Sequence, residues 1–274
     1  MNSEPTLRCL GLPHDSPVDN DHEKELALIT ESVSKFNSEA LQSQMTDVHK
    51  QAGVICLSVD EYRNSEHGKA NEHVGLFEIH AHADTILGQK ACWWPDSPRT
   101  SSKRPLAGLK VVDLTRVIAG PAISRGLSEL GASVMRVVAP HLPDLSVLHL
   151  DLNAGKWNTI LDLRNDEDRQ KLRDLVLDAD VFLQGYRPGV LDKHGFGEDD
   201  IIEMCRHRPR GIIYARENCY GWNGPWASRS GWQQISDAVS RPLPLLNCSN
   251  ADPFPARFAV FRCSLDVPWA LMSR

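Results

Sequence analysis

The sequence lacks a long apolar run and any paired-cysteine motif. No stretch approaches the eighteen consecutive apolar residues that a membrane-crossing helix requires. Acids and histidines are scattered through the first thirty residues, so the apolar core of a secretory signal is missing. The seven cysteines form neither a CxxC pair nor a cluster with histidine at zinc-finger spacing. We therefore expect a soluble, intracellular protein of the cytoplasm that holds no metal.

An excess of positive charge is also missing. The 274 residues include 30 lysines and arginines and 36 acids, which gives a net charge of -6. Binding to nucleic acid requires clustered basic side chains that displace counterions from phosphates. We therefore expect neither a nucleic acid nor a membrane as a partner. The composition is that of an ordinary globular protein, with 41% hydrophobic residues.

The sequence pattern of residues 1–93 predicts a small α+β segment, which resembles the C-terminal part of a family unit described below. Up to about residue 22 the chain contains Pro5, Pro13 and Pro17 and no regular period, so a loop is expected. From there to about residue 54, apolar residues recur at three- and four-residue steps, which predicts two amphipathic helices. Asn37-Ser38 supplies a break and a cap between them.

The end of this segment predicts one strand and one further helix. The apolar run Gly53–Leu57 is typical of a short buried strand. Ser58 and Glu61 then have the spacing of a capping box, which opens a helix. Residues 94–105 are rich in proline, serine and basic side chains, which indicates a linker.

Residues 106–240 alternate between strand and helix patterns. Such alternation predicts βαβ crossovers, and hence a Rossmann-like, mainly parallel sheet with helices on both faces. Residues 241–274 form a divergent tail. The expected strands are Leu109–Leu114, Ala132–Val138, Thr159–Leu163, Asp180–Gln184 and Ile212–Ala215, and the expected helices are Ala122–Leu130 and Asp166–Asp178.

In folds of this kind, ligands bind beyond the carboxyl ends of the strands. The loop after the first strand, Asp113–Pro121, lacks a GxGxxG fingerprint and so gives no support for a nicotinamide cofactor. The turn Gly185–Gly189, after the fourth strand, presents the permanent charge of Arg187 beside glycine backbone, which suits a phosphate or an adenine. Alternatively, this turn only ends a strand and Arg187 is solvated.

Several ordered blocks resemble the family III CoA-transferases, which include formyl-CoA transferase and α-methylacyl-CoA racemase. The resemblance implies acyl-CoA and carboxylic acids as substrates, with coenzyme A moved between the acids and no metal or redox cofactor. It also implies a homodimer. The blocks are Pro105–Pro121, Leu130–Arg136, Ile160–Leu163, Ala179–Leu191 and Gly221–Pro225.

The same resemblance implies which residues line the coenzyme A site. They follow the first and fourth expected strands or lie at the end of the third, and one basic residue lies further along. Asp162, one of them, equally fits an ordinary residue at a strand end. The set is Ile118, Ala119, Leu161, Asp162, Leu163, Arg164, Gly185, Tyr186, Arg187 and Lys193.

The chain departs from the family pattern at the catalytic positions. The resemblance implies an aspartate that attacks the thioester, forming a mixed anhydride and then a glutamyl- or aspartyl-CoA thioester on the enzyme. Asp252 is the candidate here, although the sequence Asp252-Pro253 favours an ordinary Asp-Pro turn. Trp232 stands where the racemases have a histidine base, and indole has no basic nitrogen, so racemisation is disfavoured. The alternative to a transferase is a catalytically inactive CoA-binding or interaction module.

The order of the blocks is a second departure. Residues 22–85 resemble the part of the family that normally follows the large domain, but here they precede it. This order predicts a tandem protein, in which the end of one family unit runs through the linker into the next. We expect the chain to be a fragment that spans this junction.

Overall fold

The computed structural model describes residues 4–13, 22–75, 77–81, 93–142, 144–232 and 235. Of these, the residues up to Val74 and those from Asn218 onward form one compact unit, and those from Gly75 to Glu217 form another. The candidate nucleophile Asp252 lies outside the described residues. Within the described ranges, no helix is both long enough and apolar enough to cross a membrane.

Five parallel strands form one sheet in the unit from Gly75 to Glu217. Their order across the sheet is β3-β2-β1-β4-β5, and all four pairings are parallel. The predicted Rossmann-like α/β fold is confirmed. Because the order reverses between β1 and β4, the carboxyl ends of these two strands flank the position where such folds bind ligands. The strands are β1 (Lys110–Leu114), β2 (Ser133–Val138), β3 (Trp157–Ile160), β4 (Val181–Gln184) and β5 (Ile213–Arg216).

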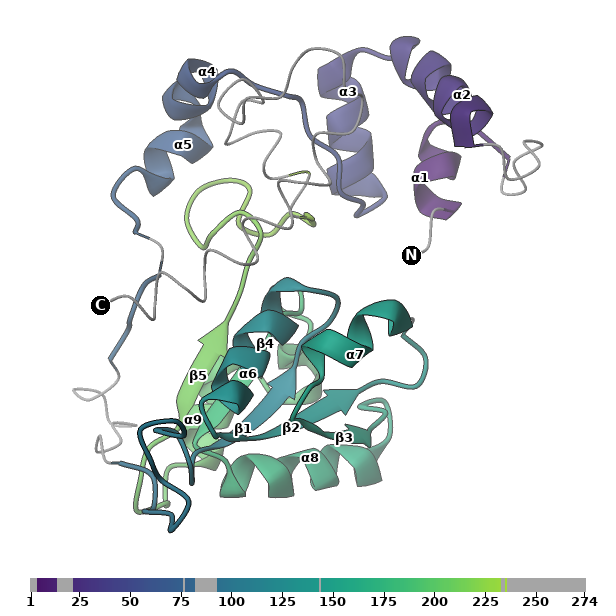
Figure 1. Ribbon diagram of the computed structural model, residues 1–274. Helices are drawn as coiled ribbons and strands as arrows, with labels where there is room; N and C mark the ends of the chain where they lie inside the picture. The colour runs from purple at the N-terminus through teal and green to yellow at the C-terminus, as the bar shows by residue number, and fades with distance from the viewer. Residues whose placement is uncertain are drawn as a thin grey trace. The chain divides into compact units, whose positions relative to one another are not determined.

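Helices cover both faces of the sheet (Figure 1). On one face Val112 of β1 packs in a cluster with Leu172 of α8 (Asp166–Asp178) and Ile201 of α9 (Glu198–Met204). On the other face Val111 packs in a cluster with Leu127 of α6 (Ala119–Glu129). Successive strand side chains point to opposite faces, so a sheet covered twice requires apolar residues at nearly every strand position. The short elements of this unit are η2 (Ser146–Leu148), α7 (His149–Leu152) and η3 (Asp192–His194).

The third strand starts two residues and ends three residues earlier than predicted, at Trp157–Ile160 instead of Thr159–Leu163. The Leu161 N–H still donates to the Val138 carbonyl at 2.9 Å, but the next N–H turns away from the ladder. The N–H of Asp162 donates to Asp168 Oδ2 on α8 at 2.9 Å. The chain therefore leaves the sheet here in order to enter α8.

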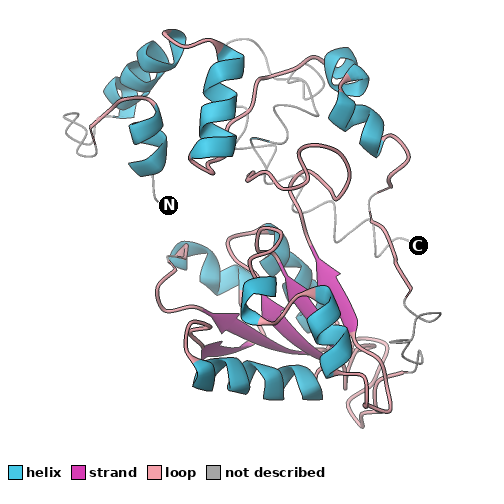
Figure 2. Ribbon diagram, turned by 180° about the vertical axis from the view of Figure 1, so that it is seen from behind, coloured by secondary structure: helices cyan, strands magenta, loops and turns pink. Residues whose placement is uncertain are grey.

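The other unit consists of short helices among its described residues (Figure 2). The predicted cap at Asn37 is confirmed, since its side chain accepts from the N–H groups of Glu39 and Ala40. The predicted capping box of Ser58 and Glu61 is also confirmed. The helices are α1 (Glu4–Cys9), α2 (His22–Ser34), α3 (Ser38–Ser43), the π-helical turn η1 (Gln44–Val48), α4 (Val59–Asn64) and α5 (Glu66–Asn71).

Two expectations for this unit are wrong. The expected loop contains helix α1, because a proline such as Pro5 is tolerated in the first turn of a helix, and because Cys9 packs with Leu41. The expected strand Gly53–Leu57 belongs to no ladder among the described residues. Its Ile55 N–H donates to the side chain of Gln42 at 2.8 Å instead of to a neighbouring strand.

The segment after Glu217 packs on α5 within the same unit. His67 is buried, and its Nε2 lies 3.0 Å from the Tyr220 carbonyl oxygen. The Trp226 ring stacks on the His67 ring with centroids 4.7 Å apart. Trp226 is therefore a packing residue, because its large ring covers the buried His67 ring.

Candidate functional site

The turn after β1 has an unusual backbone conformation. Val117 has φ 71°, a left-handed conformation that costs a β-branched residue about 1–2 kcal/mol. The next residue, Ile118, is the N-cap residue of α6, and it makes no side-chain capping hydrogen bond. Strain of this kind persists only where the surroundings impose it, and it concentrates at ligand sites. The turn that was expected to contact coenzyme A is therefore held in place by other groups.

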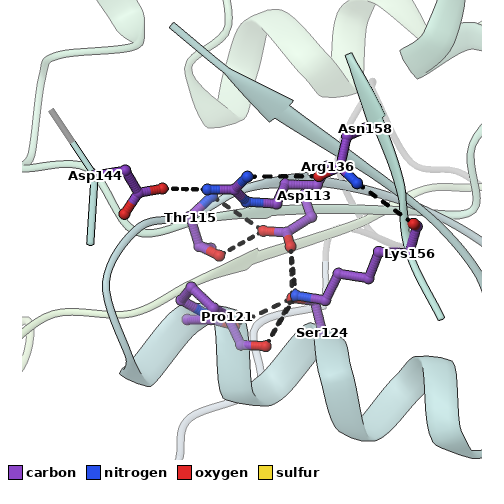
Figure 3. A network of polar contacts seen from close by, with 9 residues as sticks. Asp113, Thr115, Pro121, Ser124, Arg136, Asp144, Lys156 and Asn158 are labelled. Carbon is purple, nitrogen blue, oxygen red and sulfur yellow. Dashed lines mark hydrogen bonds and ion pairs between the residues drawn. The ribbon is translucent and has the colours of Figure 1, made fainter. Parts of the chain in front are cut away.

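A buried polar network provides that hold (Figure 3). One carboxylate oxygen of Asp113 accepts from the N–H of Thr115 at 3.0 Å and from its hydroxyl at 2.5 Å. The other oxygen accepts from the Ser124 hydroxyl of α6 at 2.5 Å and from Lys156 Nζ at 3.2 Å. The Asp113 and Lys156 side chains are both 0% exposed. The network therefore joins the end of β1 to the first turns of α6.

Lys156 brings a third element into the network. It directly precedes β3, and its Nζ also donates to the Pro121 carbonyl at 3.0 Å and to the Ser124 hydroxyl at 2.7 Å. Burial lowers the pKa of Lys156, and the charge of Asp113 opposes this shift. No role for this network was predicted from the sequence. One feature of the sequence could have indicated the network: Asp113 lies within a strand that is buried on both faces. A charge buried in this way requires polar partners.

The turn after β4 lies beside the turn after β1. The Gly185 N–H donates to the Leu114 carbonyl at 3.3 Å. The Tyr186 N–H donates to Gln184 Oε1 at 2.8 Å, and burial raises the pKa of its phenol. The Arg187 side chain is exposed and forms no ion pair with another described residue. Its guanidinium is therefore available to a ligand at this edge.

Glu217, directly after β5, lies between these two turns. Its N–H donates to the Gln184 carbonyl at 3.2 Å, and its carboxylate accepts from the N–H of Gly120. Burial raises the pKa of Glu217 to about 7, the hydrogen bond from Gly120 opposes the shift, and the nearby charge of Asp113 adds to it. Glu217 was not among the residues predicted from the sequence.

The expected residues after β3 form a separate group at the same edge. Asp162 accepts from Arg164 Nε at 2.9 Å and from Nη2 at 2.6 Å, and this hydrogen bonding lowers the pKa of Asp162. Leu161 and Leu163 pack in the core that α8 covers. Lys193 lies on η3 and is exposed. The structure thus brings the β1 and β4 residues together, whereas Asp162 and Arg164 bind each other after β3, which lies two strands away from β1 and three from β4.

Comparison with known proteins identifies the family. Residues 106–261 match the model of CoA-transferase family III. The chain belongs to this family. The match extends beyond residue 240, where the expected Rossmann-like region ends, and it includes Asp252.

Two fungal relatives align with most of the chain. An acetyl-coenzyme A transferase, nodX, of Hypoxylon pulicicidum is 56% identical over 240 residues, which are 87% of this chain and 40% of the relative. An acyl-CoA transferase of Gibberella moniliformis is 38% identical over 245 residues, 88% of this chain and 42% of the relative. The chain thus spans less than half the length of these relatives.

A solved structure matches part of the chain. The Mycobacterium tuberculosis protein Rv3272 matches with a TM-score of 0.44 and 32% identity. The match covers 56% of this chain and 42% of that protein.

Proposed function

We propose that this protein binds acyl-CoA at the carboxyl edge of its sheet and transfers coenzyme A between carboxylic acids. The observation that carries the proposal is the pairing of the β1 and β4 turns at the point where the strand order reverses. Arg187 adds an exposed guanidinium that forms no ion pair within the part of the chain that the structure describes, and such a group suits a phosphate. The family membership and the two fungal transferases support the same assignment.

The proposed chemistry needs a carboxylate nucleophile, for which Asp252 is the candidate. Its carboxylate attacks the thioester carbonyl, and the carbon–sulfur bond breaks to release the coenzyme A thiolate, which leaves a mixed anhydride. The thiolate then attacks the aspartyl carbonyl, the donor acid leaves, and an aspartyl-CoA thioester remains. The acceptor acid reverses these steps. The position of Asp252 within the family match supports this role.

The assignment extends to substrates, assembly and location. We propose acyl-CoA and a carboxylic acid as the two substrates, a homodimer as the working form, and the cytoplasm as the site of action. The names of the fungal relatives support an acyl-CoA substrate. Leu161–Arg164 and Lys193 are proposed as further contacts with coenzyme A.

Titration calorimetry with free coenzyme A tests the binding site. Arg187→Ala should weaken binding about tenfold or more, because a charge-assisted hydrogen bond contributes about 1.5–3 kcal/mol. Arg206→Ala is the matched control, because Arg206 pairs with Glu203 on α9 and should leave binding unchanged. Equal affinities for the two variants would remove Arg187 from the site.

Mass spectrometry tests the chemistry. Incubation with acetyl-CoA should give a protein whose mass has increased by that of coenzyme A minus one water, and the modified peptide should contain Asp252. The variant Asp252→Asn should bind coenzyme A without forming the adduct. Binding without an adduct in the unmodified protein would instead indicate a catalytically inactive CoA-binding module.

A further inference from the structure

The side chain of Glu217 fills the space between the two turns of the proposed site. A methyl group placed on Gly185 would lie 2.6 Å from Glu217 Oε1 and 3.2 Å from its Cγ. A methyl group placed on Gly120 would lie 3.1 Å from the same oxygen. The carboxyl group therefore rests against glycine backbone of both turns, at the point where the strand order reverses.

The surroundings of this carboxyl group favour its neutral form. It accepts from the Gly120 N–H of α6, and the backbone of Gly185 in the β4 turn lies against it. The charge that acts on it most is the Asp113 carboxylate of β1, which is itself paired with Lys156. Partial burial and a neighbouring carboxylate both oppose ionisation.

We propose that Glu217 is a positioning residue that spans the β1 and β4 turns, and that coenzyme A binds the form of the protein in which this carboxyl is protonated. The inference rests on the proposed function. Coenzyme A brings phosphate charges to this edge, and an ionised Glu217 beside the same backbone amides repels them. A protonated Glu217 keeps its carbonyl oxygen as an acceptor for the Gly120 N–H and adds a donor that can meet a phosphate oxygen.

The expected effect is a pH dependence of affinity. The apparent affinity scales with the fraction of the binding-competent form, which falls about tenfold between pH 6 and pH 8 for a group that titrates near pH 7. The dissociation constant of coenzyme A should therefore rise by up to about tenfold over this range. The 3′-phosphate of coenzyme A also titrates near pH 6, as phosphate monoesters do, so the comparison must be made between protein variants.

The test is calorimetric titration of the whole chain with free coenzyme A at several pH values. Glu217→Gln keeps the shape and stays neutral, so it should bind at pH 8 about as tightly as the unmodified protein binds at pH 6. Gly185→Ala should also reduce the pH dependence of the affinity, because the added methyl group displaces the Glu217 carboxyl from between the turns. Glu203→Gln, an exposed carboxyl on α9, is the matched control and should keep the full pH dependence.

The outcomes separate the inference from the function. A pH dependence that is the same in the unmodified protein and in Glu217→Gln overturns the role of Glu217 but leaves coenzyme A binding intact. Absence of binding at every pH overturns the proposed function and this inference with it. In the unliganded protein, the Gly120 amide resonance should titrate near neutral pH and lose this titration in Glu217→Gln. A Gly120 resonance that does not titrate also contradicts the inference.

Discussion

Removal of the buried lysine tests whether the Asp113 network holds the β1 turn. Lys156→Met deletes a cation whose side chain is 0% exposed and leaves the Asp113 carboxylate buried without its counter-ion. Breaking a buried pair in this way costs about 3–5 kcal/mol. Asp113 keeps three hydrogen bonds from Thr115 and Ser124, so the lower end of this range, about 3 kcal/mol, is expected.

Amide hydrogen exchange measures this loss locally, which is useful because the chain contains two compact units. The readout is the peptide that contains β4, whose strand pairs with β1. A loss of about 3 kcal/mol corresponds to exchange that is about 100-fold faster. Asp113→Asn combined with Lys156→Met should recover part of the loss, since the remaining charge is then neutralised.

A second lysine provides the matched control for this experiment. Lys110, on the same strand β1, pairs with Asp178 at 2.6 Å, but both side chains are exposed. Lys110→Met should therefore cost no more than about 1 kcal/mol. If Lys156→Met accelerated exchange no more than Lys110→Met does, the network would not be what holds the turn.

The sheet could be predicted from sequence because its signals are local. A strand buried on both faces is a short apolar run, and helix α8 coincides with its predicted range Asp166–Asp178. Asn165 caps this helix, and acids occupy its first turn, which are the usual signals of a helix start. The resemblance to a family then predicted a coenzyme A site in the turns at the carboxyl edge of the sheet.

The network and Glu217 could not be predicted because their partners are distant in the sequence. Lys156 lies 43 residues from Asp113, and only the strand order brings the two together. Glu217 follows an edge strand with an ordinary pattern, and its neighbours Gly120 and Gly185 come from two other crossovers. No local period or spacing encodes such a contact. The short helix α1 was missed for a related reason, because its stability depends on packing with Leu41.

Three further changes probe single features of the fold. Asn37→Ala removes the acceptor for two N–H groups of α3 and should lower the stability of its unit by about 1 kcal/mol, as seen in a denaturant midpoint. Val117→Gly relieves the left-handed strain and should raise the stability of the sheet unit by up to about 1 kcal/mol, whereas a decrease would show that the valine side chain stabilises the turn. Glu217→Gln should change stability in a pH-dependent way. The carboxyl pKa is about 7 in the folded protein and near 4.5 when unfolded, so the folded state binds the proton more tightly between these values. The stabilisation from protonated Glu217 is therefore complete below about pH 4.5 and is lost as the pH rises through 7. Relative to the unmodified protein, Glu217→Gln should gain about 1–3 kcal/mol between pH 5 and pH 8, after a discount for partial exposure. The measurement is the difference in stability between Glu217→Gln and the unmodified protein, taken from amide exchange of β4. If this difference did not vary between pH 5 and pH 8, Glu217 would be ionised between the turns throughout this range.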